Sequence, residues 1–242
     1  MLKNKVIEKT EKKAKDSRVD ALVKTGIQFG HKKSRWHPSM APYVYGIRNN
    51  MYIIDIEKME KCLIEAIKFV EDVTKQGKSI IFVATRPNIR AFLKEIAEAH
   101  KLFYVSGRWI GGTLTNFPTS RQRLNNFKEL EAKKKSSEFD KLIKRDKRVI
   151  DEEIARLEKH WGGIKNLTEM PAAIFLLDVP NNYLALKEAK KKGIKVIAIC
   201  DTDADIREVD YPIPASDDSF LAVKYILEKI VETISKAQEK TA

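Results

Sequence analysis

Three short apolar runs, separated by helical stretches, constrain the fold of this chain more than any other feature. Residues 79–84 (SIIFVA), 172–177 (AAIFLL) and 195–199 (KVIAI) are hydrophobic almost throughout, as expected of parallel strands buried on both faces. A helical pattern follows the first run after Pro87, and another fills residues 182–192 between the other two runs. This strand–helix–strand order predicts an α/β domain with a mostly parallel sheet and right-handed crossovers.

The same patterns predict the remaining elements. Residues 57–76 have one apolar helical stripe that closes at Gly77, and a last amphipathic helix is expected from about Asp217 to Lys236. Residues 43–47 and 51–54 read as two strands around an Arg48-Asn49-Asn50 turn, and 103–105 as a further short strand.

Residues 118–165 interrupt the alternation, because they hold two helical stretches, 118–135 and 138–160, with almost no strand pattern. In the second stretch the apolar residues Ile143, Ile150, Ile154, Leu157 and Trp161 have heptad-like spacing. We therefore expect a protruding antiparallel helical hairpin inserted into the sheet domain. The predicted organisation is a basic arm (1–18), a discontinuous α/β domain (19–117 and 166–236), the helical hairpin insertion (118–165) and a short tail (237–242).

The charge is strongly positive and unevenly distributed. The chain of 242 residues has a formal net charge of +12, and residues 1–35 alone carry eleven lysines and arginines against four acids. Residues 200–218 have seven acids and one base. An anionic partner on one face and a different partner on another are expected from this asymmetry. Cys62 and Cys200 form no disulfide framework, which favours a reducing compartment, and no apolar run is long enough for a membrane span.

Residues 26–55 interleave cations with flat rings. Lys32, Lys33, Arg35 and Arg48 lie among aromatic residues that include Trp36, His37 and Tyr45. Cations bind phosphates, and rings stack on unstacked bases, so the mixture favours a folded RNA surface. The alternative is an irregular loop whose rings pack underneath while its charges face solvent.

No catalytic fingerprint is present. The glycines of 107–113 have neither dinucleotide-binding nor P-loop spacing, and the histidines lack metal-site spacing. Asp201, Asp203 and Asp205 follow a strand and could hold a cation together with Asp217 and Asp218. We favour the alternative, in which these acids are solvated turn residues or cap the last helix.

Taken in order, several segments resemble the bacterial-type small-subunit ribosomal protein two family. They are GIQFGHKKSRWHPSMAPYVYGIRNNMYIIDIEK (26–58), FVATR (82–86), GRWIGGTLTNFPTSRQRL (107–124), FDKLIKRDK (139–147), GGIKNL (162–167), PAAIFLLD (171–178), ALKEA (185–189) and CDTDADIREVDYPIPASDDS (200–219). The resemblance spans roughly residues 19–235. Gln28 and the pair Ala215-Ser216 depart from the family pattern, which argues against a family-type cation site.

The resemblance implies a structural constituent of the small ribosomal subunit and not an enzyme. It implies a Rossmann-like α/β domain with a protruding coiled-coil hairpin, and binding to small-subunit ribosomal RNA between head and body. Because of the departures from the family pattern, we expect no metal or other cofactor. The implied partners are that RNA and neighbouring small-subunit proteins, with the large mRNA-binding protein one as a further candidate. The expected form is not a homo-oligomer, and the expected location is the cytoplasmic ribosome, an organellar ribosome being the second choice.

The RNA contacts are expected from the loop 29–48, the segment 107–123 and one strand end. The candidate residues are Lys32, Lys33, Arg35, Trp36, His37, Arg48, Arg86, Arg108, Trp109, Arg121 and Arg123. Whether the tryptophans stack on bases or brace the loops stays open. Two other classes also stay open: an α/β enzyme or nucleotide-binding protein that uses the strand-end carboxylates, and a non-ribosomal RNA adaptor whose helical hairpin contacts proteins.

Overall fold

Five parallel strands form the main sheet, in the order β5-β4-β6-β7-β8. The computed structural model describes residues 21–239, so the predicted basic arm and the last three residues of the predicted tail, 240–242, lie outside the described residues. The strands are β4 (Ile80–Val83), β5 (Phe103–Val105), β6 (Ala173–Leu176), β7 (Lys195–Cys200) and β8 (Tyr211–Pro214). The predicted α/β architecture with a parallel sheet is confirmed.

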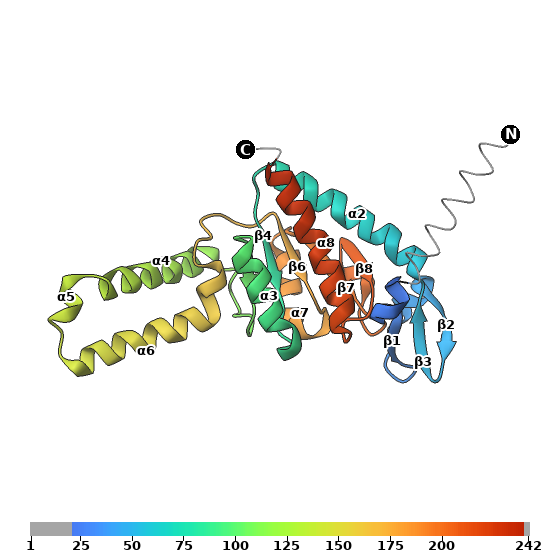
Figure 1. Cartoon of the computed structure of the whole chain (residues 1–242), viewed down its shortest axis with the longest axis horizontal. Coiled ribbons are helices and arrows are strands. Elements are labelled where there is room, and N and C mark those ends of the chain that lie inside the picture. The colour runs from blue at the N-terminus through green and yellow to red at the C-terminus, as the bar shows by residue number, and fades with distance from the viewer. Residues whose placement is uncertain (1–20, 240–242) are drawn as a thin grey trace.

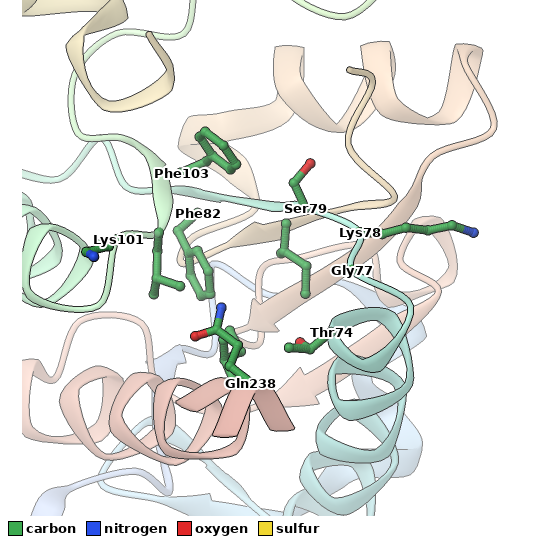
Figure 2. Close-up of a pocket in the computed structure, with 11 residues that line it drawn as sticks. Thr74, Gly77, Lys78, Ser79, Phe82, Lys101, Phe103 and Gln238 are labelled. Atoms are coloured by element: carbon green, nitrogen blue, oxygen red, sulfur yellow. The ribbon is translucent and has the colours of Figure 1, made fainter. Parts of the chain in front are cut away.

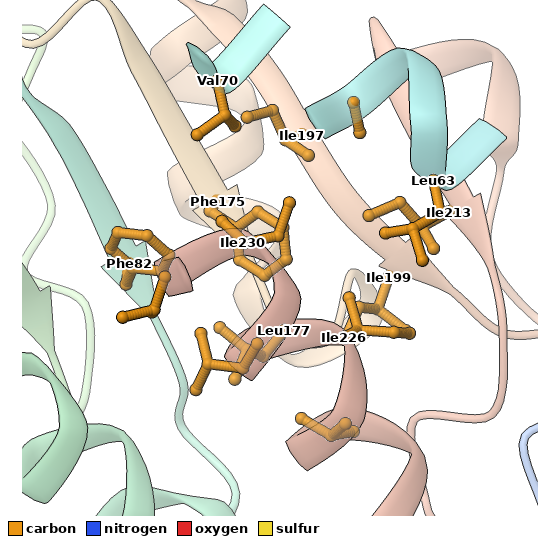
Figure 3. Packing of buried hydrophobic residues seen from close by; sticks show 14 of the residues in the cluster. Leu63, Val70, Phe82, Phe175, Leu177, Ile197, Ile199, Ile213, Ile226 and Ile230 are labelled. Carbon is orange, nitrogen blue, oxygen red and sulfur yellow. The ribbon is translucent and has the colours of Figure 1, made fainter. Parts of the chain in front are cut away.

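Helices cover both faces of this sheet because successive strand residues point to opposite sides. On one face, Phe82, Phe175 and Ile197 pack against α2 (Ile56–Lys75), α3 (Pro87–Ala99) and α8 (Phe220–Glu239); Figure 3 shows this layer. On the other face, Ile81, Ile174 and Val196 pack against α7 (Tyr183–Lys191) and the residues that follow α6. The strands are therefore apolar throughout, as their sequences predicted.

A second, antiparallel sheet of three strands lies beside the end of the main sheet (Figure 1). It consists of β1 (Phe29–Lys32), β2 (Val44–Arg48) and β3 (Met51–Ile54), and a 3₁₀ helix (Pro38–Tyr43) precedes β2. Asn49 and Asn50 both have positive φ, 50° and 62°, which two-residue hairpin turns require. The predicted hairpin is confirmed, whereas β1 was not expected.

Close backbone contacts fix the small sheet to the carboxyl end of the main sheet. A Cβ on Gly30 would lie 2.4 Å from Thr202 Cγ2, so only glycine fits at this crossing. The His31 amide donates to Thr202 Oγ1 at 2.9 Å, and the His37 amide donates to the Thr202 carbonyl at 2.7 Å. The first basic loop is thereby held against the strand-end segment that begins at Asp201.

The segment between β5 and β6 forms a helical pair that extends away from the sheets (Figure 1). Its elements are α4 (Phe117–Lys134), the single turn α5 (Ser137–Asp140) and α6 (Lys144–Trp161). The prediction of one continuous second helix over 138–160 is wrong, because the helix is interrupted between Asp140 and Lys144. Ile143 is 65% exposed and not on a buried stripe, whereas Leu157 and Trp161 are buried where the pair joins the body. Packing is therefore tight at the base of the pair.

The last helix begins at Phe220, later than expected. The Ser219 hydroxyl, and not Ser216 or Asp217, accepts from a first-turn amide of α8, that of Ala222, at 3.4 Å. Within residues 21–239, no helix combines the length and apolar character needed to cross a bilayer.

Candidate functional site

Three cations gather at the outer end of the small sheet, where β1 ends and β2 turns into β3. Lys32 and Arg48 both pair with Met51 across the ladder, and the Lys33 amide donates to the Asn50 carbonyl at 3.0 Å. All three side chains are exposed. Within residues 21–239, none lies within 4.0 Å of a carboxylate. We call Lys32, Lys33 and Arg48 the basic rim; their charge is available to an anion.

The neighbouring candidates of the same loop are engaged within the protein. Arg35 forms an ion pair with Asp203 at 2.8 Å. The Trp36 ring stacks on Tyr52 with centroids 4.9 Å apart, and it remains 36% exposed. His37 Nδ1 lies 2.7 Å from Ser39 Oγ and caps the 3₁₀ helix. The Trp36 ring therefore braces the loop from one side and keeps part of its surface in solvent.

The second predicted segment divides into exposed cations and a buried ring. Arg108, Arg121 and Arg123 are exposed. Trp109 is only 4% exposed and packs in the core layer beneath α7. Its Nε1 donates to Glu188 Oε1 at 3.3 Å. For Trp109 the structure thus favours the bracing alternative over base stacking.

Glu188 of α7 organises this segment and was not expected as a key residue. Its carboxylate accepts from the backbone amides of Gly112, Leu114 and Thr115 at 2.7, 2.9 and 3.1 Å. Burial opposes the charge, but these amides together lower the pKa of Glu188 below its usual value. The sequence could have indicated a buried role for this glutamate, because Glu188 lies on the same helical stripe as the buried residues Ala185 and Ala189.

Asp201 and Asp217 are buried, so their interpretation as solvated turn or capping residues is wrong, whereas Asp218 is exposed and Asp205 caps a 3₁₀ turn at Ile206–Glu208. Asp178 and Asp201 are each 1% exposed, and Asp217 is fully buried. The Arg86 guanidinium contacts Asp178 and Asp218, and its Nη2 lies 3.0 Å from Asp217 Oδ1. Arg86 therefore neutralises carboxylates of its own chain, which leaves less of its charge for RNA.

His31 lies against the same carboxylates. Its Nδ1 is 3.2 Å from Asp201 Oδ1, and this contact is the main cause that raises the pKa of His31 to about 9 against the opposing effect of burial. Burial is the main cause that raises the pKa of Asp217 to about 8, and the neighbouring Asp201 adds to it. His31 and Asp217 are therefore both protonated at neutral pH.

The same geometry fits a divalent cation. His31, Asp201 and Asp217 each offer a ligand atom, and these atoms lie within 4.8 Å of one another. Asp217 Oδ2 is buried without a hydrogen-bond partner, and Asp217 Oδ1 has the ion pair with Arg86 but no hydrogen bond. Nitrogen and oxygen ligands of this kind suit Zn²⁺. From the sequence, a cation at these acids was considered but not favoured, because aspartate is common in turns and Gln28 and Ala215-Ser216 depart from the family pattern.

We expect Zn²⁺ to stabilise the chelator-treated protein through these three residues. A ligand that binds only the folded state at a hundredfold excess over its Kd adds about 2.7 kcal/mol to the free energy of unfolding. Thermal denaturation with and without Zn²⁺ measures this gain, which His31→Gln should remove. His100→Gln is the matched control, because His100 lies elsewhere and contacts Ser235. Equal gains in both variants would exclude the site.

A cavity of about 400 Å³ lies at the amino ends of β4 and β5 in the main sheet. Thr74 of α2, Phe103 of β5 and Gln238 of α8 line it, and Figure 2 shows Phe82 at its wall. Its lining includes two lysines, Lys78 and Lys101, but no histidine, cysteine or carboxylate. It offers no set of reactive or ligating groups.

Two comparisons with known proteins agree with this arrangement. The family model described as ribosomal protein S2 matches residues 22–237. The small ribosomal subunit protein uS2 of Coprothermobacter proteolyticus is 40% identical over 218 residues, which cover 90% of this chain and 81% of that protein. The match includes both sheets, the helical pair and the strand-end cluster. The chain therefore belongs to the ribosomal protein S2 family.

Proposed function

We propose that this protein is a structural constituent of the small ribosomal subunit, where it binds ribosomal RNA and catalyses no reaction. Family membership supports the role, and the basic rim is the single structural observation that carries the binding. Three exposed cations without carboxylate neighbours within residues 21–239 leave charge for phosphates. Within residues 21–239 the strand-end acids pair with cations of the same chain, Asp201 with His31, Asp203 with Arg35 and Asp217 with Arg86, which supports a structural role for them.

The contact with RNA is mainly electrostatic and positional. Lys32, Lys33 and Arg48 bind phosphates from the small sheet, and Arg108, Arg121 and Arg123 extend the contact along the start of α4. Trp36 presents its exposed edge to an unstacked base. Arg35, Arg86, His37 and Trp109 hold these groups in place, because each is engaged within the protein. The sheets form the rigid scaffold that fixes the spacing of the cations.

The proposed organisation assigns different partners to different parts of the chain. The α/β domain (19–117 and 166–236) faces small-subunit RNA between head and body. The insertion (118–165) acts as a coiled-coil hairpin, and the basic arm (1–18) and tail (237–242) complete the chain. Neighbouring small-subunit proteins are further partners, with the large mRNA-binding protein one as a candidate, and the acidic 200–218 surface contacts a protein and not RNA. The location is the small subunit of the cytoplasmic ribosome.

Sedimentation of the tagged chain tests the assignment to the small subunit. In sucrose gradients of a cell extract at low salt, the protein should migrate with the small subunit, because the RNA contacts are formed there. Raising the salt should release it, since each phosphate contact releases counterions. A chain that stays at the top of the gradient, or that migrates with other RNA particles, would contradict the proposal.

A further inference from the structure

A cavity of about 660 Å³ opens at the carboxyl ends of β4 and β6. The two strands are neighbours, but the chain continues from β4 to β5 on one side and from β6 to β7 on the other. Open α/β sheets bind their ligands at such a reversal of strand order. Volumes between about 300 and 1,000 Å³ are typical of small-molecule sites. The cavity is thus placed and sized as a ligand site.

The lining of the cavity attracts an anion. Arg90 and Arg108 are exposed at its edge, and no carboxylate of residues 21–239 lies within 4.0 Å of either guanidinium. Arg90 Nε donates to the Thr85 carbonyl at 2.6 Å, which fixes this cation beside the opening. The thirteen-residue helix α3 also begins here, at Pro87, without a side-chain cap. The helix dipole adds partial positive charge at this N-terminus.

Two buried polar atoms in the same lining lack partners. Thr85 Oγ1 and Asn182 Oδ1 are both buried and form no hydrogen bond. Asn182 is 1% exposed, and its Nδ2 donates to the Asp178 carbonyl at 2.7 Å, which orients the amide. A buried acceptor without a donor is costly in a native protein. A ligand that carries N–H or O–H donors would satisfy it.

The rest of the lining includes an apolar part. Leu184 at the start of α7 is 49% exposed, and it lines the cavity together with Pro87 and Trp109. Inorganic phosphate would use the cations but neither this wall nor the buried acceptor. A nucleotide has all three matching parts: a phosphate, donor groups and a flat apolar face.

We propose that this cavity binds one nucleotide unit, with its phosphate at Arg90 and Arg108 and its base against Leu184. The inference rests on the proposed function, because the bound RNA is one source of such a unit. A nucleotide turned out of the RNA stack would enter as far as Asn182. A free nucleoside monophosphate has the same chemistry and is the second source.

The test compares Leu184→Trp, which fills the cavity, with Leu221→Trp, which adds the same ring to an exposed leucine of α8. Each full-length variant is titrated with small-subunit ribosomal RNA and, separately, with AMP, GMP, CMP and UMP. Loss of one bound nucleotide unit from the cavity should weaken binding roughly tenfold, which corresponds to about 1.4 kcal/mol. We expect this loss for Leu184→Trp and none for Leu221→Trp. The change should leave the salt dependence unaltered, because no cation is removed.

The outcomes separate the two sources and the two proposals. If Leu184→Trp loses affinity only in the RNA titration, the bound nucleotide belongs to the RNA. If it loses affinity only for the monophosphates, the cavity binds a free nucleotide. No difference between the variants in either titration overturns the inference. The inference is also overturned if inorganic phosphate displaces the bound nucleotide as effectively as the monophosphates do. Failure of the wild-type chain to bind ribosomal RNA would instead contradict the proposed function.

A second variant guards against misfolding of Leu184→Trp. Thr85→Val removes a buried hydroxyl that has no partner, so it should leave the melting temperature unchanged or raise it. It should still weaken nucleotide binding several-fold. A purely structural role of Thr85 would not give these opposite effects.

Discussion

We expect Glu188→Ala to lower the free energy of unfolding by about 3 kcal/mol or more. The substitution removes the only carboxylate that accepts from the amides of Gly112, Leu114 and Thr115. Each buried donor left without a partner costs about 1–3 kcal/mol, and water can reach only part of this loop. Urea denaturation monitored by circular dichroism measures the loss. Arg108 should become more mobile as well, because the loop that positions it is released.

The matched control for this variant is Glu228→Ala on α8. Glu228 is exposed, and its carboxylate forms a single surface ion pair with Lys224 at 3.8 Å. Such pairs contribute about 0–1 kcal/mol, so this variant should unfold nearly like the wild type. A similar loss in both variants would show that the amides of the loop find other partners and that Glu188 does not organise the segment.

Glu188→Gln gives the pH dependence of the same contact. The amides hold the pKa of Glu188 below its ordinary value of 4.5. A depressed pKa in the folded state contributes stability that is complete above the unfolded pKa and is lost as the pH falls through the folded pKa. The wild type should therefore exceed Glu188→Gln by a constant free energy above pH 4.5. That difference in free energy should shrink at lower pH. A difference that does not change with pH would contradict a stabilising role of the ionised Glu188 carboxylate.

The sheet could be predicted from sequence because its strands are buried on both faces. Continuous apolar runs such as 172–177 have few alternatives to a central strand. The edge strand β8 escaped prediction, since Pro212 and Pro214 argue against a strand. An edge position tolerates prolines because one side of the strand needs no amide donors. The hairpin turn was predictable from Asn49 and Asn50, whereas β1 depends on pairing with β3 and has no local pattern.

The candidate site was predictable only in part, for a different reason. Residue type identified the cations, but their availability depends on which carboxylates the fold brings near them. Arg35 and Lys33 are two positions apart, yet only Arg35 meets an acid, Asp203. Asp217 looks like an exposed turn residue in sequence. It is buried because the ends of β7 and β8 lie side by side and place it behind Arg86.

Removing the basic rim should have the largest effect on RNA binding. In the triple variant Lys32→Ala, Lys33→Ala, Arg48→Ala, three phosphate contacts are lost. Each contact contributes about 0.7–0.9 to the slope of log affinity against log salt, so the slope should become shallower by about 2. At about 0.1 M salt the affinity for small-subunit ribosomal RNA should fall roughly a hundredfold. Filter binding over a series of salt concentrations measures both quantities.

A lower positive net charge could by itself weaken binding to RNA, so the control must remove three positive charges from another part of the surface. Lys68 on α2, and Lys191 and Lys192 at the end of α7, are exposed lysines that lie outside the small sheet and its loops. Their triple alanine variant has the same net charge as the rim variant but keeps every proposed phosphate contact. Its slope should equal that of the wild type, because the slope counts the contacts made and not the total charge. If the two triple variants lose slope equally, the RNA senses only overall charge and the rim is not the interface.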